Sequence, residues 1–250
     1  MKKSVLLAIV ISLCLGYTVS AARAEVKVSG DVYAGMYSKY LFRGIDLSDN
    51  KWVSQFGADL SYKGFTLSYW SNLLTHDIAG TAFDSGDISE TDVTLNYSFT
   101  PVKLLTFNLG NTFYSLENAE DTNEIYLKTT LNTLLSPTLS LYWDWDQSEE
   151  TGLFYTFSLG HTFELVKGLG LNLGALVSYN QQNFSVSEDF SNWNNYELSA
   201  GLDYSVNDNV KLSASYTYSN AISHKARQLG GAGLGINDES LFGFKAAFIF

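Results

Sequence analysis

The last ten residues, LFGFKAAFIF, constrain the fold of this chain more than any other segment. Phe242, Phe244, Phe248 and Phe250 share one parity, and the other parity holds small or charged residues. Because alternate side chains of a β-strand point to opposite faces, one face of this strand is aromatic up to the terminal carboxylate. An apolar outer face with a polar inner face is typical of outer-membrane β-barrels. The competing interpretation is the edge strand of a secreted sandwich.

The first 24 residues are typical of a cleaved signal peptide. Two lysines precede a short apolar run, residues 5–15, and an A-x-A cleavage site ends at Ala24. The run is too short for a comfortable membrane-spanning helix. We therefore expect a signal peptide over residues 1–24 and one β-barrel domain over residues 25–250. The single cysteine, Cys14, lies in the leader, so the mature chain has no thiolate for a disulfide or a metal site.

The charge balance narrows the possible partners. The chain has 26 acidic and 15 basic residues, a formal net charge of −11, and three of the basic residues lie in the predicted leader. This excess argues against a nucleic-acid or phosphate-binding surface. Since no second long apolar segment follows the leader, the chain can cross a membrane only as a closed barrel.

Period-2 alternation recurs along almost all of the mature chain and predicts an all-β, antiparallel up-and-down barrel of about twelve strands, most of them long enough to span a membrane when tilted. The expected strands cover residues 26–43, 51–62, 65–74, 90–99, 103–115, 124–135, 138–147, 152–164, 170–181, 194–206, 210–222 and 239–250.

The connections between these strands alternate in length. Connections after even-numbered strands are short, as at Lys63-Gly64, and most of those after odd-numbered strands are longer. Short periplasmic turns that alternate with long outer loops are the outer-membrane pattern, so both termini are expected on the periplasmic side. Hairpin parity agrees, because a Lys63-Gly64 turn sets apolar residues opposite one another: Tyr62 with Phe65, Leu60 with Leu67, and Ala58 with Tyr69.

Residues 38–72 read SKYLFRGIDLSDNKWVSQFGADLSYKGFTLSYWSN. This segment resembles the start of the mature chain in the TorF-type porins, also called the Gcw_chp family. The matching positions are Ser38, Tyr40, Phe42, Arg43, Gly44, Ser48, Asp49, Asn50, Lys51, Gln55, Gly57, Asp59, Gly64, Phe65, Trp70, Ser71 and Asn72. Trp52 departs from the family, which commonly has proline there, and the middle of the chain is only loosely similar. The resemblance implies a small outer-membrane pore and no particular substrate.

The parity opposite the apolar one predicts the lumen of the barrel. A lumen of mixed charge is too polar for a dry core and is expected to hold water and local ion pairs. A three-residue turn around Pro137 would set Lys128 opposite Asp144. Two roles are left open for the inward residues, namely stabilisation of the wall and control of selectivity. The pore-lining or eyelet candidates are Lys39, Arg43, Asp59, Trp70, Asp92, Lys128, Asp144 and Asp146.

The segment after the first predicted strand is a candidate mouth loop. Arg43 points inward by parity, and Gly44 is suited to the positive φ that ends a strand. We expect residues 44–50 to fold into the mouth, with Arg43 anchoring them through Asp46 or Asp49. A structural anchor and a selectivity eyelet are both compatible with this arrangement.

These patterns predict an outer-membrane channel for passive diffusion of small polar solutes or ions. The alternative is a non-conducting structural or adhesive barrel. An enzyme is less consistent with the sequence, since His161 shares the lipid-facing parity but lies near the periplasmic end of its strand, and we predict no catalytic residue, cofactor or metal. The expected partners are outer-membrane lipid and lipopolysaccharide, the barrel-assembly machinery through Phe250, and small solutes or ions, with a monomeric barrel and no nucleic acid.

Overall fold

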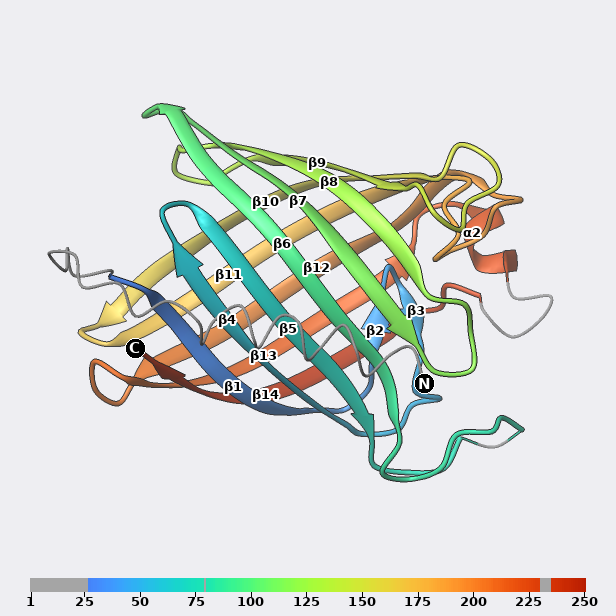
Figure 1. Ribbon diagram of the computed structural model, residues 1–250, viewed down its shortest axis with the longest axis horizontal. Helices are drawn as coiled ribbons and strands as arrows, with labels where there is room; N and C mark the ends of the chain where they lie inside the picture. Colours follow the sequence, from blue (N-terminus) through green and yellow to red (C-terminus); the bar gives the residue numbers. More distant parts are fainter. Residues whose placement is uncertain (1–26, 79, 230–234) are drawn as a thin grey trace, which may run out of the picture.

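The computed structural model describes residues 27–78, 80–229 and 235–250 and forms a closed antiparallel barrel of twelve strands. Each strand pairs with its neighbours in the sequence, and β1 pairs with β14 to close the ring (Figure 1). The strands of the wall are β1 (Ser29–Tyr37), β4 (Val53–Tyr62), β5 (Phe65–Leu74), β6 (Ile88–Val102), β7 (Leu105–Leu116), β8 (Thr122–Leu131), β9 (Thr138–Asp144), β10 (Leu153–Val166), β11 (Leu169–Gln181), β12 (Ser191–Ser205), β13 (Val210–Ala221) and β14 (Glu239–Ile249). The predicted fold class and strand number are confirmed.

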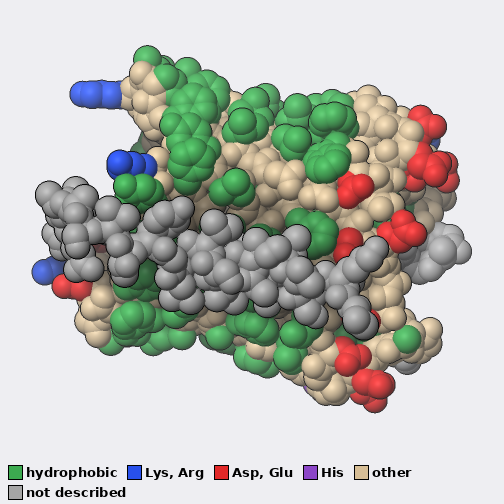
Figure 2. Space-filling model, viewed as in Figure 1, with side chains coloured by type: hydrophobic (Ala, Val, Ile, Leu, Met, Phe, Trp, Pro, Cys, Tyr) green, Lys and Arg blue, Asp and Glu red, His purple; other side chains and the backbone are tan. Residues whose placement is uncertain are grey.

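The outer wall of the barrel is apolar. The stripe that ends the chain points outward, and Phe242, Phe244, Phe248 and Phe250 are 51, 59, 50 and 51% exposed. Apolar side chains cover the wall in bands in Figure 2. So large an exposed apolar surface is stable only in contact with lipid. Because every second residue of each strand faces the lipid, the sequence of a membrane barrel alternates between apolar and polar residues. Among the described residues, no helix is long and apolar enough to cross a membrane.

Local turn chemistry sets the register between β4 and β5. Lys63 has φ 49° and Gly64 has φ 87°, which suits the tight turns with two left-handed residues that match the twist of a hairpin. Tyr62 faces Phe65, and the predicted pairing continues along both strands. Where β1 and β14 close the barrel, the backbones of Phe250 and Gly30 exchange two hydrogen bonds of 3.0 Å.

The two ends of the barrel differ. The chain terminus at Phe250 lies at the end that carries the tight turns, and the longer loops and the short helix α2 (His224–Gln228) lie at the other end (Figure 1). We call these the turn end and the loop end. Acidic side chains gather at the loop end in Figure 2.

The first predicted strand, residues 26–43, is wrong at its C-terminal end. β1 ends at Tyr37, and the chain then forms a separate two-stranded hairpin, β2 (Leu41–Phe42) and β3 (Ile45–Asp46). Figure 1 shows this hairpin within the outline of the barrel near the loop end. Alternation continues past Tyr37 because the hairpin is itself extended, and periodicity does not tell which neighbour an extended segment pairs with.

Candidate functional site: the hairpin in the barrel mouth

The tip of the β2–β3 hairpin is Arg43-Gly44. Gly44 has φ 85°, so its predicted positive φ is confirmed. Arg43, the residue before it, also has a positive φ, of 52°. Phe42 pairs with Ile45 on the two arms. Both tip residues are left-handed, which lets the chain reverse within two residues and present the Arg43 side chain to the lumen.

Arg43 is held by an ion pair with Glu124 of β8. Its Nη2 donates to both carboxylate oxygens of Glu124, at 2.8 and 2.6 Å, and its Nη1 donates to Asn183 Oδ1 at 2.9 Å and to Ser185 Oγ at 2.6 Å. The side chains of Arg43 and Glu124 are 7 and 3% exposed. Burial is the largest influence and acts to lower the pKa of Arg43, but the charge and hydrogen bonds of Glu124, together with Tyr114 and Tyr142, raise the pKa above its ordinary value.

Aromatic rings surround the Arg43 guanidinium. Its Cζ lies 4.3 Å from the ring centre of Phe154, 4.9 Å from that of Phe42 and 5.2 Å from that of Tyr142. Contacts of this kind stabilise a desolvated guanidinium. The Arg43 carbonyl also accepts a hydrogen bond of 2.9 Å from Asn194 Nδ2 of β12. The hairpin tip is therefore held both by its side chain and by its backbone.

The predicted anchors Asp46 and Asp49 do not contact Arg43 through any described hydrogen bond or ion pair. Asp46 instead closes its own loop, accepting from the backbone amides of Ser48 at 2.9 Å and Asn50 at 2.7 Å. Asp49 is exposed, with φ 51°. An aspartate next to a turn reaches its own backbone more easily than a side chain across the hairpin, so local bonding prevails here.

The segment that precedes the hairpin is buried in the mouth as well. Lys39 is 6% exposed and pairs with Glu239 and, at 3.6 Å, with Asp46. Tyr40 donates a hydrogen bond of 2.9 Å to Glu90 Oε2, and its ring lies 5.4 Å from that of Trp70. Burial first, and then the Glu90 carboxylate, raises the pKa of Tyr40 well above its usual range.

The predicted pairing of Lys128 with Asp144 is wrong. Lys128 faces Ser140, and Asp144 faces Glu124. The turn after β8 is six residues long rather than three, because it is held by hydrogen bonds of 2.8 Å to both neighbouring hairpins, from Asn132 N to Leu104 O and from Gly160 N to Leu135 O. The predicted partner Asp144 and the observed partner Ser140 are four residues apart, an even number, so Lys128 and Asp144 both keep their inward parity.

The remaining candidates lie at three levels of the barrel. Asp144 is 2% exposed and accepts from Thr122 Oγ1 at 2.8 Å and from backbone amides of the following loop. Asp146 is exposed in that loop, beyond β9. Asp92 of β6 faces Trp70 of β5, and Asp59 of β4 faces Asp31 of β1. These aspartates therefore do not form one ring around the lumen.

Two cavities meet at the hairpin tip. One, of about 190 Å³, lies on the side of Leu47, Phe184 and Ser185. The other, of about 240 Å³, lies on the side of Thr156, Leu176 and Glu197. Phe42, Arg43 and Tyr114 line both cavities. These three residues and Glu124 are the candidate constriction.

The partners of Arg43 do not follow from the sequence. Glu124 follows from inward parity alone, but nothing in the sequence joins it to Arg43, 81 positions away. Asn183 and Asn194 come from the β11–β12 loop and from the start of β12, and they are fully buried. Asparagine in and near loops is ordinarily a turn residue, so composition carries no signal for these two.

No protein-family model matches the chain, and no curated protein matches it. Solved structures share its fold. The NanC porin aligns with a TM-score of 0.58 at 14% identity, covering 88% of this chain and 98% of that one. The KdgM porin aligns at 0.56 and 13%, covering 89% and 99%. The COG4313 outer-membrane channel of Pseudomonas putida F1 aligns at 0.52 and 11%, covering 94% and 100%.

The chain thus has the fold of outer-membrane porins and channels at very low sequence identity. The structural alignments show the architecture, and sequence identity this low does not establish a substrate. The resemblance to the TorF-type porins is not confirmed by a family match.

Proposed function

We propose that the chain is an outer-membrane channel for passive diffusion of small polar solutes or ions, with the β2–β3 hairpin as its constriction. The observation that carries the proposal is that Phe42, Arg43 and Tyr114 line the cavities on both sides of the hairpin tip. In this proposal, a solute that crosses the barrel moves from one cavity to the other past these side chains. The porin architecture of NanC, KdgM and the COG4313 channel supports this function.

The charge of the lumen favours cations and neutral solutes. Its bases are engaged by other groups: Lys39 by Glu239, Arg43 by Glu124, Lys211 by Asp203 at 3.9 Å, Lys128 by the rings of Tyr126 and Tyr142, and Lys245 by the ring of Tyr33. Asp31 and Asp59 face each other across β1 and β4, and in the described part of the chain neither forms an ion pair. A passing cation therefore meets two carboxylates that form no ion pair, although the charges of Lys245 and Lys211 act on Asp31.

KdgM has been solved in complex with disordered oligogalacturonate, an acidic oligosaccharide. An acidic solute would be repelled by Asp31 and Asp59. We therefore propose a different class of solute for this chain than the ligand in that complex.

The proposal includes a setting in the membrane. The turn end, where β1 begins and β14 ends, faces the periplasm, and the loop end faces outward, as the alternation of loop lengths indicates. The barrel acts as a monomer, lies in lipid and lipopolysaccharide, and is recognised by the assembly machinery through Phe250. Membership of the TorF-type porins is supported by the matching residues between Ser38 and Asn72.

Single-channel recording from the chain that begins at Glu25, refolded into a planar bilayer, tests the function. Discrete conductance steps are expected, with a reversal potential in a salt gradient that shows preference for cations. A correctly folded barrel, recognised by its heat-modifiable migration, that never conducts would contradict the channel.

A plugged, non-conducting barrel is the second candidate, and one observation favours it. A buried apolar cluster joins the hairpin to the loops above it and to α2, and its members are Ile45, Phe154, Val186, Phe190, Ala221, Ala226 and Ile236. A structural or adhesive barrel needs no open path through this cluster. Silence of the wild type, with conductance gained only after the hairpin is removed, would select this candidate.

An enzyme is not proposed. The structures that share the fold and are named above are porins and a channel. His161 lies edge-on to Phe163, with ring centres 4.5 Å apart, so its ring packs against a neighbour on the same strand. Lipid hydrolysis by purified protein that disappears in His161→Ala would contradict this assignment.

A further inference from the structure

The loop end of the barrel carries mostly acidic side chains, and most of its exposed bases lie on one short helix. Exposed carboxylates gather there, namely Asp49, Asp77, Asp84, Glu117, Glu120, Asp146, Glu149, Glu150, Asp189 and Asp238. Of the described residues, the exposed lysines and arginines at this end are Lys51, Lys225 and Arg227. Two of them belong to α2, which also presents His224, so basic charge is concentrated at one place on the rim.

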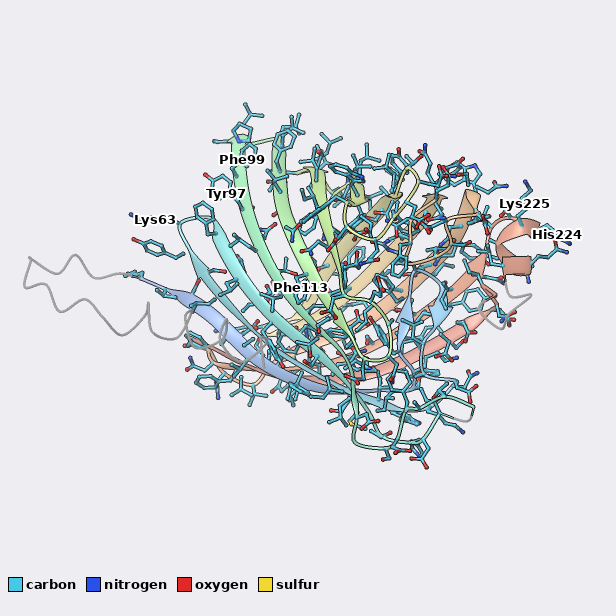
Figure 3. The ribbon with its side chains drawn as sticks, turned by 45° about the vertical axis from the view of Figure 1, so that its right-hand side comes forward. Lys63, Tyr97, Phe99, Phe113, His224 and Lys225 are labelled. Atoms are coloured by element: carbon cyan, nitrogen blue, oxygen red, sulfur yellow. The ribbon has the colours of Figure 1, made fainter. Side chains whose placement is uncertain are left out.

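The helix α2 is fixed on the barrel. Ala226 is completely buried and packs in the apolar cluster that includes Ile45 and Ile236. Ser223 donates to the carbonyl of Trp193 at 2.7 Å and accepts from the amide of Ala226 at 3.1 Å. Because the opposite face is anchored, the basic side chains are held outward, and Figure 3 shows His224 and Lys225 projecting from the helix away from the barrel.

Arg227 lies against the outer wall. Its Nη2 donates to Asn220 Oδ1 at 2.8 Å, and Asn220 in turn donates to the hydroxyl of Tyr218 at 2.9 Å. Tyr218 faces Leu198, which is 52% exposed on the lipid side of β12, so Tyr218 and Asn220 share the lipid-facing parity of β13. A guanidinium is thus placed directly above an aromatic girdle residue.

Trp193 extends the same rim. It is 51% exposed, and its ring lies edge-on to Tyr179 at 5.8 Å between ring centres. Tryptophan and tyrosine concentrate at the level of lipid headgroups. The basic face of α2 therefore stands at the height where the charged groups of the outer leaflet lie.

We propose that Lys225 and Arg227 form a docking site for the phosphate of a lipid A headgroup in the outer leaflet. Charge complementarity carries the assignment, since a basic pair above an aromatic girdle matches an anionic headgroup whose acyl chains lie along the wall. The acidic remainder of the rim repels phosphate, which directs the lipid to this side of the barrel. The inference rests on the proposed outward orientation of the loop end and not on conduction.

The test measures binding of bis-phosphorylated lipid A, and of the same lipid with its phosphates removed, to folded protein in neutral detergent. The variant is Lys225→Gln/Arg227→Gln. The matched control is Lys63→Gln/Lys103→Gln, which removes two exposed lysines from turns at the opposite end of the barrel, where Figure 3 places Lys63. Heat-modifiable migration and single-channel steps report folding and conduction separately, so loss of the lipid site and failure of the pore are distinguishable.

We expect the α2 variant to bind phosphorylated lipid A about 30-fold more weakly, as two surface cations predict, while the turn-end variant binds as the wild type does. The wild type should lose a similar factor when the phosphates are removed from the lipid. Equal binding by wild type and α2 variant, equal loss in the turn-end variant, or displacement of lipid A by an equimolar amount of inorganic phosphate would each overturn the proposal.

Discussion

Nη2 of Arg43, at the tip of the β2–β3 hairpin, lies 2.8 and 2.6 Å from the two carboxylate oxygens of Glu124 on the barrel wall. Both side chains are almost completely buried. This ion pair joins the two-stranded hairpin to β8 of the barrel wall. Its strength therefore governs both the stability of the mouth and the width of the proposed constriction.

Glu124→Gln is expected to destabilise the folded barrel by about 3–5 kcal/mol, because it leaves the Arg43 charge buried without a counter-charge. The hairpin tip should then leave the lumen, so the single-channel conductance should rise. Urea titration in micelles measures the first effect and planar-bilayer recording the second. The control is Asp203→Asn, whose partner Lys211 lies 3.9 Å away in a pair that is about one-third exposed, and it should cost below about 1 kcal/mol. Equal costs for the two variants would show that the Arg43 pair does not hold the hairpin.

Gly44→Ala tests the packing of the hairpin tip. Gly44 has φ +85°, and a Cβ there would lie 3.0 Å from three atoms of Asn195, which is 1% exposed and bonded to Ser178 and Ser219. Gly80→Ala is the control, since Gly80 has φ +79° and open space around its Cβ. We expect about 1 kcal/mol of backbone strain at Gly80 and an additional 1–3 kcal/mol, roughly, from overpacking at Gly44. If the two variants melt together, the hairpin tip has room to move.

Tyrosine rings cover glycines on neighbouring strands inside the lumen. Tyr126 faces Gly110 across β7 and β8, and a Cβ at Gly110 would lie 2.4 Å from the tyrosine hydroxyl oxygen. The same Cβ would lie 2.8 Å from the backbone carbonyl oxygen of Leu95, so Gly110→Ala should displace the ring and also strain the neighbouring strand, at a cost of about 1–3 kcal/mol. Gly160→Ala is the matched control, because its Cβ would meet only a carbonyl oxygen at 3.6 Å. A cost at Gly160 as large as that at Gly110 would refute the tyrosine cover as the cause.

Phe250→Ala tests whether Phe250 acts in closure of the barrel between β1 and β14 or in recognition by the assembly machinery. The two backbone bonds between Phe250 and Gly30 survive the substitution, so the yield of refolding in micelles should change little. In cells the amount of barrel inserted in the outer membrane should fall several-fold if the terminal ring is the signal for assembly. Phe248→Ala removes an aromatic side chain from the same stripe and is the control. Equal losses in cells and in micelles would assign Phe250 a packing role alone.

Asp59→Asn tests whether the lumen prefers cations over anions. Asp59 faces Asp31 in the lumen, and removal of one carboxylate should move the reversal potential in a salt gradient toward that of a non-selective pore. Measurements at low ionic strength enlarge the effect, because salt screens charges in water. Asp84→Asn, in an exposed loop, should leave the potential unchanged. A shift toward greater cation preference in Asp59→Asn would exclude the proposed role.

The barrel wall could be predicted almost in full from the sequence. Alternation placed Phe242, Phe244 and Phe248 on the lipid side, and the Lys63-Gly64 turn determined the register of its hairpin. Both are local effects, because facing depends only on parity within one strand and a tight turn depends on two residues. The lipid environment makes the pattern unusually clear, since the two faces of each strand meet solvents of opposite polarity.

The candidate site was predictable only in part. The positive φ of Gly44 follows from its residue type. The inward position of Arg43 was predicted from the parity of a strand that in fact ends at Tyr37, so here the expected direction holds for a different structural reason. The pairing of Arg43 with Glu124 and the turn after β8 that sets Lys128 opposite Ser140 depend on how the closed barrel brings distant segments together. These contacts join residues that closure of the barrel brings together from distant strands and loops, and their register depends on hydrogen bonds to neighbouring hairpins. Parity along one strand carries no information about such neighbours.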